Sequence, residues 1–186
     1  MEKLTANFNG IDILKDRNDL LVCCVCGIVL NKWDIALDCK KKVGMAFSIS
    51  RDGYWMVHPR FKEVCDEAGL FGGKFVKLSS SYFVLIPLRI IKIKQWLEKR
   101  KLCPECGNYE LVAVNGPPRL AEDEVPPAPL ELTRSNLEYG NKAMRAFDIW
   151  VGNEAADILR AARLRGLDFT EHSYPGMKRT TRIGPD

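Results

Sequence analysis

The chain has 186 residues and a formal net charge of +4, and 46% of its residues are hydrophobic. This length suits one domain, with or without a small appendage, that buries a core of ordinary size. Pro87, Arg89 and Lys92 interrupt the most apolar stretch, so no run approaches the roughly 20 residues that span a bilayer, and we expect a soluble protein with no membrane partner. A charge this mild does not require a nucleic-acid partner.

The first 20 residues predict no regular element. From Leu21 the sequence LVCCVCGIVL is apolar and β-branched on both sides of a cysteine motif, which is typical of two strands that meet at a turn. Trp33, Ile35 and Leu37 alternate with polar or small residues and predict that the second strand continues through them. The three lysines at 40–42 favour an exposed turn over a phosphate site.

Residues 44–88 predict an inserted strand-helix-strand unit. Residues 45–50 alternate between apolar and polar or small side chains, the pattern of a half-buried strand. A short amphipathic helix is expected to begin near Pro59 and to end at Gly69, with apolar residues at i, i+3, i+4 and i+7 between them. Two further strands are predicted at 75–78 and 82–88.

The composition changes after residue 114. Residues 115–130 hold five prolines and a short acidic run at 122–124, which predict an extended linker with solvated charges. The linker divides the chain into a zinc-ribbon-like region, 1–114, and a carboxyl-terminal unit, 131–174, that packs on the same core. We expect residues 175–186 to form a flexible tail.

The carboxyl-terminal unit repeats the strand-helix-strand pattern. FDIWV predicts a strand, Asn153 is a good N-cap for an amphipathic helix, Gly166 ends that helix, and LDFTEH predicts a second strand. Trp55 and Trp150 stand at matching places before the two helices, which favours two related units. The sequence therefore predicts an α+β fold with mixed or antiparallel sheets and two short amphipathic helices.

Two cysteine motifs, each reading Cys-x-x-Cys-Gly, predict a split zinc-ribbon-like site. Their cysteines are Cys23, Cys26, Cys103 and Cys106. Four thiolates fill the tetrahedral shell of one structural Zn²⁺ and leave no position for a catalytic water. The glycine after each pair can take a positive φ that other residues disfavour. Residues 27–102 separate the motifs, whereas a compact ribbon has about 15–20 residues there, so a domain is inserted in the ribbon.

Redox pairs and disulfides are alternatives for the same cysteines. We favour a metal because the seven cysteines leave an odd thiol, the start of the chain has no signal-peptide pattern, and the reducing cytoplasm in which we place the protein disfavours disulfides. Cys24 lacks the two-residue gap to Cys26, and Cys39 is isolated. Cys65 lies on the apolar face of the first helix and is expected to be buried.

Catalytic signals are weak. His58 and His172 are the only histidines, and we expect both to be ordinary surface or capping residues. The chain has no G-x-S-x-G, P-loop or dinucleotide-binding fingerprint. The sequence therefore predicts a binding protein and not an enzyme.

The motifs together resemble a known family. CCVCG at 23–27 and CPECG at 103–107, their wide separation, the insert, the proline-rich stretch and the ending FDIWVGNEAADILRAARLRGLDFTEH resemble the double-CxxCG immunity proteins, bacterial antidotes to polymorphic or contact-dependent toxins. The likeness extends from about Leu21 to His172. It implies a cytoplasmic antidote that binds and neutralises one cognate toxin protein on a zinc-supported scaffold, and it assigns no toxin-binding residue.

Two other functions remain open from the sequence. A zinc-ribbon nucleic-acid-binding protein is the alternative, because basic residues surround Trp96 and would give salt-dependent binding. These residues are Arg89, Lys92, Lys94, Lys99, Arg100 and Lys101. A redox or metal-handling enzyme that uses the Cys-x-x-Cys pairs is the third hypothesis.

Overall fold

The computed structural model of the chain describes residues 1–39 and 44–171. The lysine turn expected at 40–42, His172 and the tail expected at 175–186 lie outside these residues. The α+β fold class is confirmed, because two short helices accompany two sheets whose strands pair mainly antiparallel. In this described part of the chain, no helix has the length and apolar character needed to cross a membrane.

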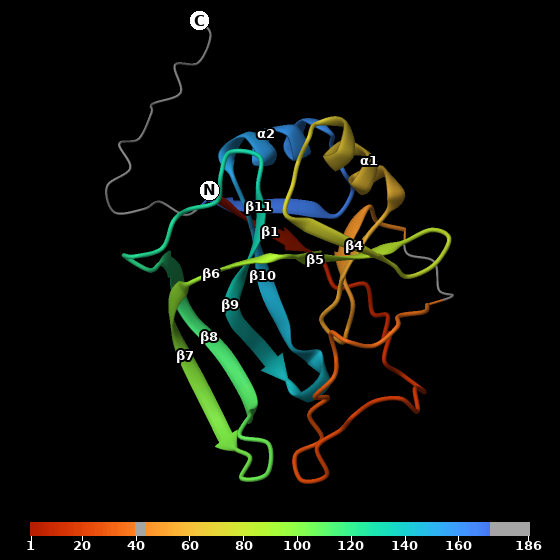
Figure 1. Ribbon diagram of the computed structural model, residues 1–186, viewed down its shortest axis with the longest axis vertical. Helices are drawn as coiled ribbons and strands as arrows, with labels where there is room; N and C mark the ends of the chain where they lie inside the picture. Colours follow the sequence, from red (N-terminus) through yellow and green to blue (C-terminus); the bar gives the residue numbers. More distant parts are fainter. Residues whose placement is uncertain (40–43, 172–186) are drawn as a thin grey trace, which may run out of the picture.

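Two sheets form the molecule (Figure 1). The larger sheet contains β1 (Glu2–Ala6), β6 (Arg89–Ile91), β7 (Ile93–Leu102), β8 (Tyr109–Leu120), β9 (Leu132–Asn141), β10 (Ala146–Val151) and β11 (Leu167–Glu171). Its order is β11-β1-β10-β9-β8-β7, and β6 pairs with β9 in parallel. The smaller sheet has the order β2-β3-β5-β4, formed by β2 (Phe47–Ile49), β3 (Trp55–Val57), β5 (Phe83–Pro87) and β4 (Gly73–Lys77). A short 3₁₀ helix, η1 (Lys142–Met144), joins β9 to β10.

The two sheets contain the same strand-helix-strand arrangement. In the smaller sheet α1 (Pro59–Glu67) connects β3 to β4, and β5 lies between these strands, antiparallel to both. In the larger sheet α2 (Asn153–Ala161) connects β10 to β11, and β1 lies between them, antiparallel to both. The outer strands of each unit therefore run parallel to one another. The central strand follows the unit in the first half, whereas the start of the chain supplies it in the second.

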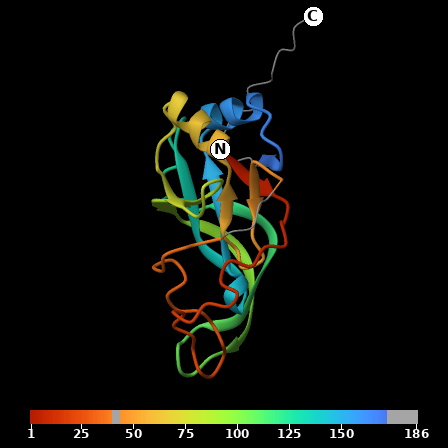
Figure 2. The same ribbon diagram turned by 90° about the vertical axis from the view of Figure 1, so that its right-hand side faces the viewer.

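One hydrophobic core joins the two halves. It includes Phe47 and Phe61 from the first half and Phe147 and Leu159 from the second, all completely buried. The indole N–H of Trp55 donates a hydrogen bond of 2.9 Å to the carbonyl oxygen of Phe147 and so links the two sheets. Both helices lie together at one end of the molecule, opposite the tip of the β7–β8 hairpin (Figures 1 and 2).

The helix ends differ in how they are capped. His58 precedes α1, and its Nδ1 accepts a hydrogen bond of 3.2 Å from the backbone N–H of Arg60, as expected of a capping residue. The prediction of Asn153 as the N-cap of α2 is wrong by one residue, because the N-cap is Gly152. A Cβ atom at Gly152 would stand 2.0 Å from the carbonyl oxygen of Ala128, so a capping side chain does not fit there.

Three sequence expectations about strands need correction. β1 occupies part of the opening segment, for which no element was predicted. The strand expected through Trp33, Ile35 and Leu37 is absent from the described chain, where turns and irregular backbone occupy these positions. Trp33 instead packs between the rings of Tyr54 and Phe147, at centroid distances of 5.1 and 5.0 Å. The apolar alternation there reflects this packing.

The third correction concerns the predicted linker at 115–130. Its first six residues belong to β8, which pairs with β7 as far as Leu120. Asn115 lies opposite Trp96 and Arg119 lies opposite Lys94, so the register of the two strands shifts between these pairs. The prolines at 117 and 118 lie in the resulting bulge, where the ladder does not need a backbone N–H from them. Only residues 121–130 lie between strands.

Candidate metal centre

The first cysteine knuckle is a tight turn between short extended segments. Val22 forms an isolated antiparallel bridge with Val29, and the N–H of Cys23 donates to the carbonyl of Ile28 at 2.9 Å. The N–H of Gly27 returns to the carbonyl of Cys23, also at 2.9 Å. Gly27 has a φ of +73°, the left-handed conformation that the sequence analysis expected for this glycine.

The second knuckle repeats this hydrogen-bond pattern at the tip of the β7–β8 hairpin. The N–H of Cys103 donates to the carbonyl of Asn108 at 2.8 Å, and the N–H of Gly107 donates to the carbonyl of Cys103 at 3.0 Å. The φ of Gly107 is +67°. The same five-residue sequence pattern therefore folds into the same local turn at two distant places in the chain.

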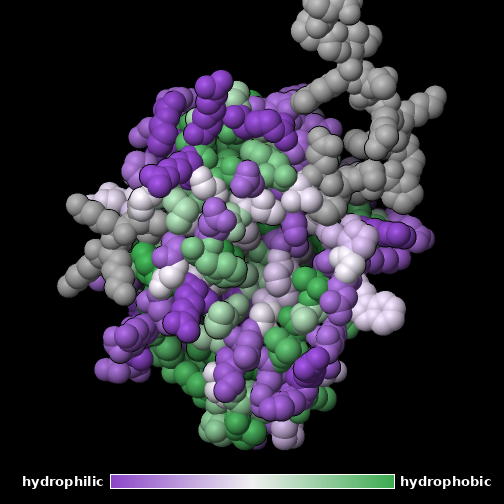
Figure 3. Space-filling view, turned by 180° about the vertical axis from the view of Figure 1, so that it is seen from behind, coloured by the Kyte–Doolittle hydropathy of each residue, from purple (hydrophilic) through white to green (hydrophobic). Residues whose placement is uncertain are grey.

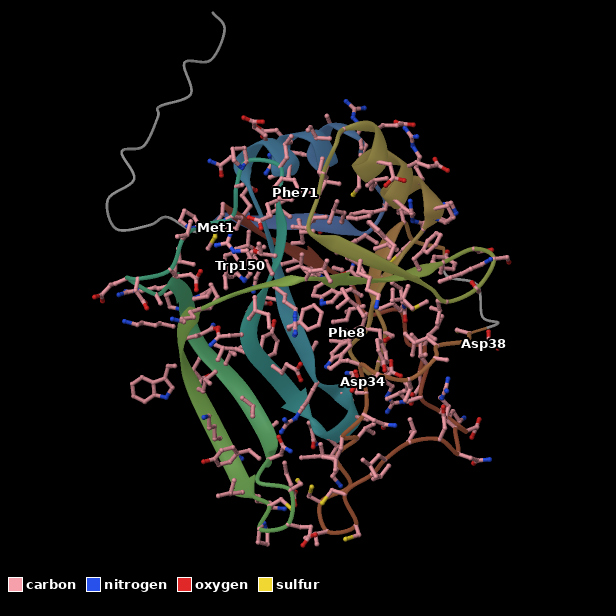
Figure 4. All side chains as sticks on the ribbon, in the orientation of Figure 1. Met1, Phe8, Asp34, Asp38, Phe71 and Trp150 are labelled. Atoms are coloured by element: carbon pink, nitrogen blue, oxygen red, sulfur yellow. The ribbon has the colours of Figure 1, made fainter. Side chains whose placement is uncertain are left out.

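The two knuckles bring the four predicted cysteines together. The Sγ atoms of Cys23 and Cys103 are 3.7 Å apart, those of Cys26 and Cys106 are 3.6 Å apart, and all four lie within 4.8 Å of one another. Figure 4 shows sulfur atoms gathered between the two loops at one end of the molecule, far from Met1 and Trp150. All four cysteines are free thiols.

These separations fit a metal site. A disulfide would bring two sulfurs to about 2.05 Å. Four sulfurs arranged tetrahedrally at about 2.3 Å from an ion stand roughly 3.8 Å from each other, close to both separations given above. Three of the four cysteines are buried and Cys106 is half-buried. The cluster could therefore hold one metal ion with no open coordination position.

The surroundings of the sulfurs lower the pKa of some of these thiols and raise that of another. Backbone N–H groups of Cys26 and Val25 lower the pKa of Cys23, and the backbone N–H of Asn108 lowers the pKa of Cys106 to about 6. Burial raises the pKa of Cys26 to about 12. Backbone donors that stabilise thiolates favour the form of cysteine that binds a cation.

Lys32 anchors the first knuckle to the body of the protein. Its buried ammonium group donates to the carbonyl oxygens of Asp52, Ala143 and Arg145, with 3.1 Å to Ala143. Three carbonyls match the three N–H donors of a lysine. Burial lowers the pKa of Lys32 to about 8. No sequence motif marks Lys32, although a lone lysine within an apolar stretch is the available signal.

Arg145 anchors the second knuckle. It precedes β10, and its guanidinium donates to the carbonyl of Tyr109 and to Oδ1 of Asn108, the latter at 3.5 Å. Both knuckles are therefore attached to the segment that joins η1 to β10. This attachment places them side by side before any metal is considered.

The remaining cysteines stay outside the cluster. Cys24 is exposed, and Cys39 is half-buried with its N–H donating to the carbonyl of Leu78 at 3.1 Å. Cys65 is 1% exposed in the helix face that packs on the core, as the sequence analysis expected.

The basic stretch around Trp96 is largely neutralised. Carboxylates pair with five of its six cations: Arg89 with Glu124 and Glu131, Lys92 with Asp123, Lys94 with Glu122, Arg100 with Glu98, and Lys101 with Glu110. The sixth, Lys99, lies over the ring of Tyr109 at 5.2 Å. Three of these partners form the acidic run at 122–124. The side chains of Glu122 and Asp123 stay 95% and 72% exposed, so these charges are solvated as expected while they pair with Lys94 and Lys92.

In comparisons with protein families, with curated proteins and with solved structures, nothing matches this chain. The geometry of its own residues therefore carries the functional argument, and the resemblance drawn from the cysteine motifs remains a prediction.

Proposed function

We propose that the four cysteines hold one structural Zn²⁺ ion and that the protein is an immunity protein that binds and neutralises a cognate bacterial toxin. The metal proposal is supported by the short separations of the four sulfurs and by a donor set of four thiolates, which suits zinc and leaves no site for hydrolytic chemistry. On this proposal the ion stabilises the fold, and a surface of the protein binds the toxin.

A group of exposed apolar side chains, the knuckle face, carries the binding part of the proposal. It consists of Leu21, Val22, Val25, Leu30 and Leu102. The first four residues flank or lie within the first knuckle, and Leu102 immediately precedes Cys103. Because the sulfurs of Cys23 and Cys103 are 3.7 Å apart, the residues beside them gather at one end of the molecule. Figure 3 shows apolar residues at this end, among charged ones.

An exposed apolar group on a rigid support is typical of a protein-binding surface. Val25 is 61% exposed although it lies between two cysteines whose positions the cluster fixes. Binding therefore costs little backbone entropy, because the knuckle backbone is already fixed. This favours recognition of another protein by the knuckle face.

The test is co-expression with the product of the gene adjacent to this one. The wild-type chain should restore growth to cells that produce that toxin, and Val25→Ser should weaken the protection. Val125→Ser is the matched control, because Val125 is 67% exposed outside the knuckle face and the change removes the same atoms. Metal content and solubility should be equal in all three proteins. Unchanged toxicity in the presence of folded, soluble wild-type protein would reject the proposal.

Nucleic-acid binding is the second candidate because Trp96 is 78% exposed on β7 between cations. Stacking of a base on such a ring is a known mode of single-strand binding. The ion pairs of the basic stretch reduce the positive charge that would attract phosphates. A shift of the protein with single-stranded DNA or RNA at low salt, lost in Trp96→Ala, would favour this candidate over toxin binding.

A further inference from the structure

A groove lies beside β9, where the larger sheet opens. On the edge of β9 that faces away from β10, β6 pairs with residues 133–135 and β8 pairs with residues 140 and 141. In the described part of the chain, no strand pairs with this edge at residues 136–139. The opening has a volume of about 490 Å³, and residues of β6, β7, β8 and β9 line it, together with Arg145 and the residues that follow Cys106. We call it the β9 groove.

The lining of the β9 groove is cationic. Lys99, Arg134 and Arg145 contribute three positive charges, and Glu138 is its one carboxylate among the described residues. Glu138 is already engaged, since it accepts a hydrogen bond of 3.0 Å from the indole N–H of Trp33 and lies 3.8 Å from the guanidinium of Arg134. The charges that face the groove therefore favour an anion.

Two guanidinium N–H donors of this lining lack a hydrogen-bond partner within the described part of the protein. The Nε atoms of Arg134 and Arg145 are buried, and neither has a hydrogen-bond partner among the residues that the structure describes. Buried donors without partners are rare in folded proteins, and each one calls for an unplaced ion, water or ligand. Both atoms belong to arginines that line the same groove, and the positive charge of these guanidinium groups would attract a ligand with acceptor oxygens.

The two arginines are also held in place by other contacts. The guanidinium of Arg134 lies 4.9 Å from the centre of the Phe147 ring. Arg145 is fixed by its bonds to Asn108 and Tyr109. Side chains that are already ordered lose little entropy on binding, and a planar guanidinium matches the spacing of two oxygens on one carboxylate or phosphate.

We propose that the β9 groove is a binding site for an oxyanion, the carboxylate or phosphate group of a ligand, held by Arg134, Arg145 and Lys99. Its volume lies within the range of small-ligand sites, about 300 to 1,000 Å³. The site is separate from the knuckle face and does not depend on the toxin-binding proposal. The oxyanion comes either from a free small anion or from an acidic side chain of another protein.

The experiment is an NMR titration of the ¹⁵N-labelled full chain at constant ionic strength. The probes are inorganic phosphate, acetate and tetraglutamate, with sodium chloride as the balancing salt. We expect saturable shifts of the Nε–H resonances of Arg134 and Arg145 and of the backbone N–H groups of Asn108 and Tyr109. Arg134→Gln should weaken binding about tenfold, the effect of one charge-assisted hydrogen-bond pair.

The controls separate binding from misfolding and from general charge effects. Lys99→Gln removes an exposed cation from the groove and should weaken binding several-fold without disturbing the core. Lys94→Gln removes the same charge from the same strand outside the groove and should leave affinity within twofold. Amide spectra that match the wild type outside the groove establish that each variant is folded.

The outcomes divide the possible sources. Saturation by phosphate alone assigns the site to a phosphate-bearing small ligand. Saturation by tetraglutamate well below the concentration needed for acetate assigns it to an acidic segment of a protein, and similar saturation by acetate and phosphate assigns it to a small oxyanion in general. If none of the three probes gives saturable shifts, or if Lys99→Gln and Lys94→Gln behave alike, the proposal is overturned.

Discussion

The Sγ atoms of Cys23 and Cys103 lie 3.7 Å apart although 80 positions separate the two residues in the sequence. Their contact joins the opening segment of the chain to the tip of the β7–β8 hairpin. The whole smaller sheet and α1 are inserted between them. An ion at this point would therefore close a long loop around half of the protein.

Loss of one sulfur should release the ion and destabilise the fold. We expect Cys103→Ser to reduce the metal content from one ion per chain to none and to lower the melting temperature. Zinc binding contributes about 10 to 16 kcal/mol in zinc-finger peptides, and a chain that also has a large core should lose only part of that. Elemental analysis and thermal unfolding measure both effects. Cys24→Ser is the control, because the exposed Cys24 lies outside the cluster and its removal should leave both quantities unchanged.

Replacement of Lys32 by methionine should destabilise the protein by about 3 kcal/mol. The change keeps the unbranched apolar stem of the side chain but leaves the carbonyls of Asp52, Ala143 and Arg145 without their donor, and a buried unsatisfied group costs about 1 to 3 kcal/mol. Chemical denaturation gives the free energy of unfolding. An unchanged value would mean that water satisfies these carbonyls and that Lys32 is not an anchor.

The contribution of Lys32 should also depend on pH. Burial lowers its pKa from 10.5 to about 8, so between these values the unfolded chain binds a proton at this position that the folded chain has lost. The free energy of unfolding therefore rises with pH in this window. The difference between wild type and Lys32→Met should grow by on the order of 2 kcal/mol from pH 7 to 9.5. Cysteines and tyrosines titrate in both proteins and cancel, so a difference that stays constant with pH would contradict the lowered pKa.

Two cysteines outside the cluster should react at very different rates. Cys24 is exposed, whereas Cys65 is 1% exposed and burial raises its pKa to about 12. The thiolate is the reactive form, so at pH 8 a disulfide reagent should label Cys24 quickly and Cys65 only after unfolding. Cys24→Ser should remove the fast phase, and Cys65→Ser should keep it. Fast labelling of Cys65 in the native protein would show that α1 opens readily.

The groove and the metal centre should be coupled through Asn108. Its backbone N–H lies against the sulfur of Cys106, its carbonyl accepts from Cys103, and its Oδ1 accepts from Arg145 in the groove lining. Removal of the ion with a chelator should therefore broaden the Asn108 and Tyr109 resonances and weaken phosphate binding several-fold. Re-addition of zinc should restore both. If phosphate affinity is unchanged after full metal removal, the contacts of Arg145 are sufficient to keep this side of the β9 groove in place.

Local sequence patterns accounted for the elements whose cause is local. The helical spacing of apolar residues and the glycines at 69 and 166 predicted both helices, and alternation predicted β2. The Cys-x-x-Cys-Gly motifs predicted two tight turns with a positive φ at the glycine. Each of these features depends on interactions between residues a few positions apart, which are readable without knowledge of the rest of the chain.

The strands that were missed depend on distant partners. β1 is short and mixed in polarity, and it is held as a strand because β10 and β11 pair with its two edges. β9 contains the polar residues Thr133 and Ser135, which are buried and hydrogen-bonded to carbonyls, so apolar alternation does not mark it. The prolines of β8 suggested a linker because the bulge that accommodates them is a property of the pairing with β7.

The sequence by itself determined two Cys-x-x-Cys-Gly turns, two amphipathic helices and the α+β class, because short-range spacing and side-chain type suffice for them. The motifs also predicted that the four sulfurs meet, and the structure confirms it. Only the tertiary structure decided that the first strand completes the second strand-helix-strand unit and that Arg134 and Arg145 line one groove. These relationships depend on the pairing of strands far apart in the chain. Such pairing is set by burial and hydrogen bonding over the whole core, and no single stretch of residues carries that information.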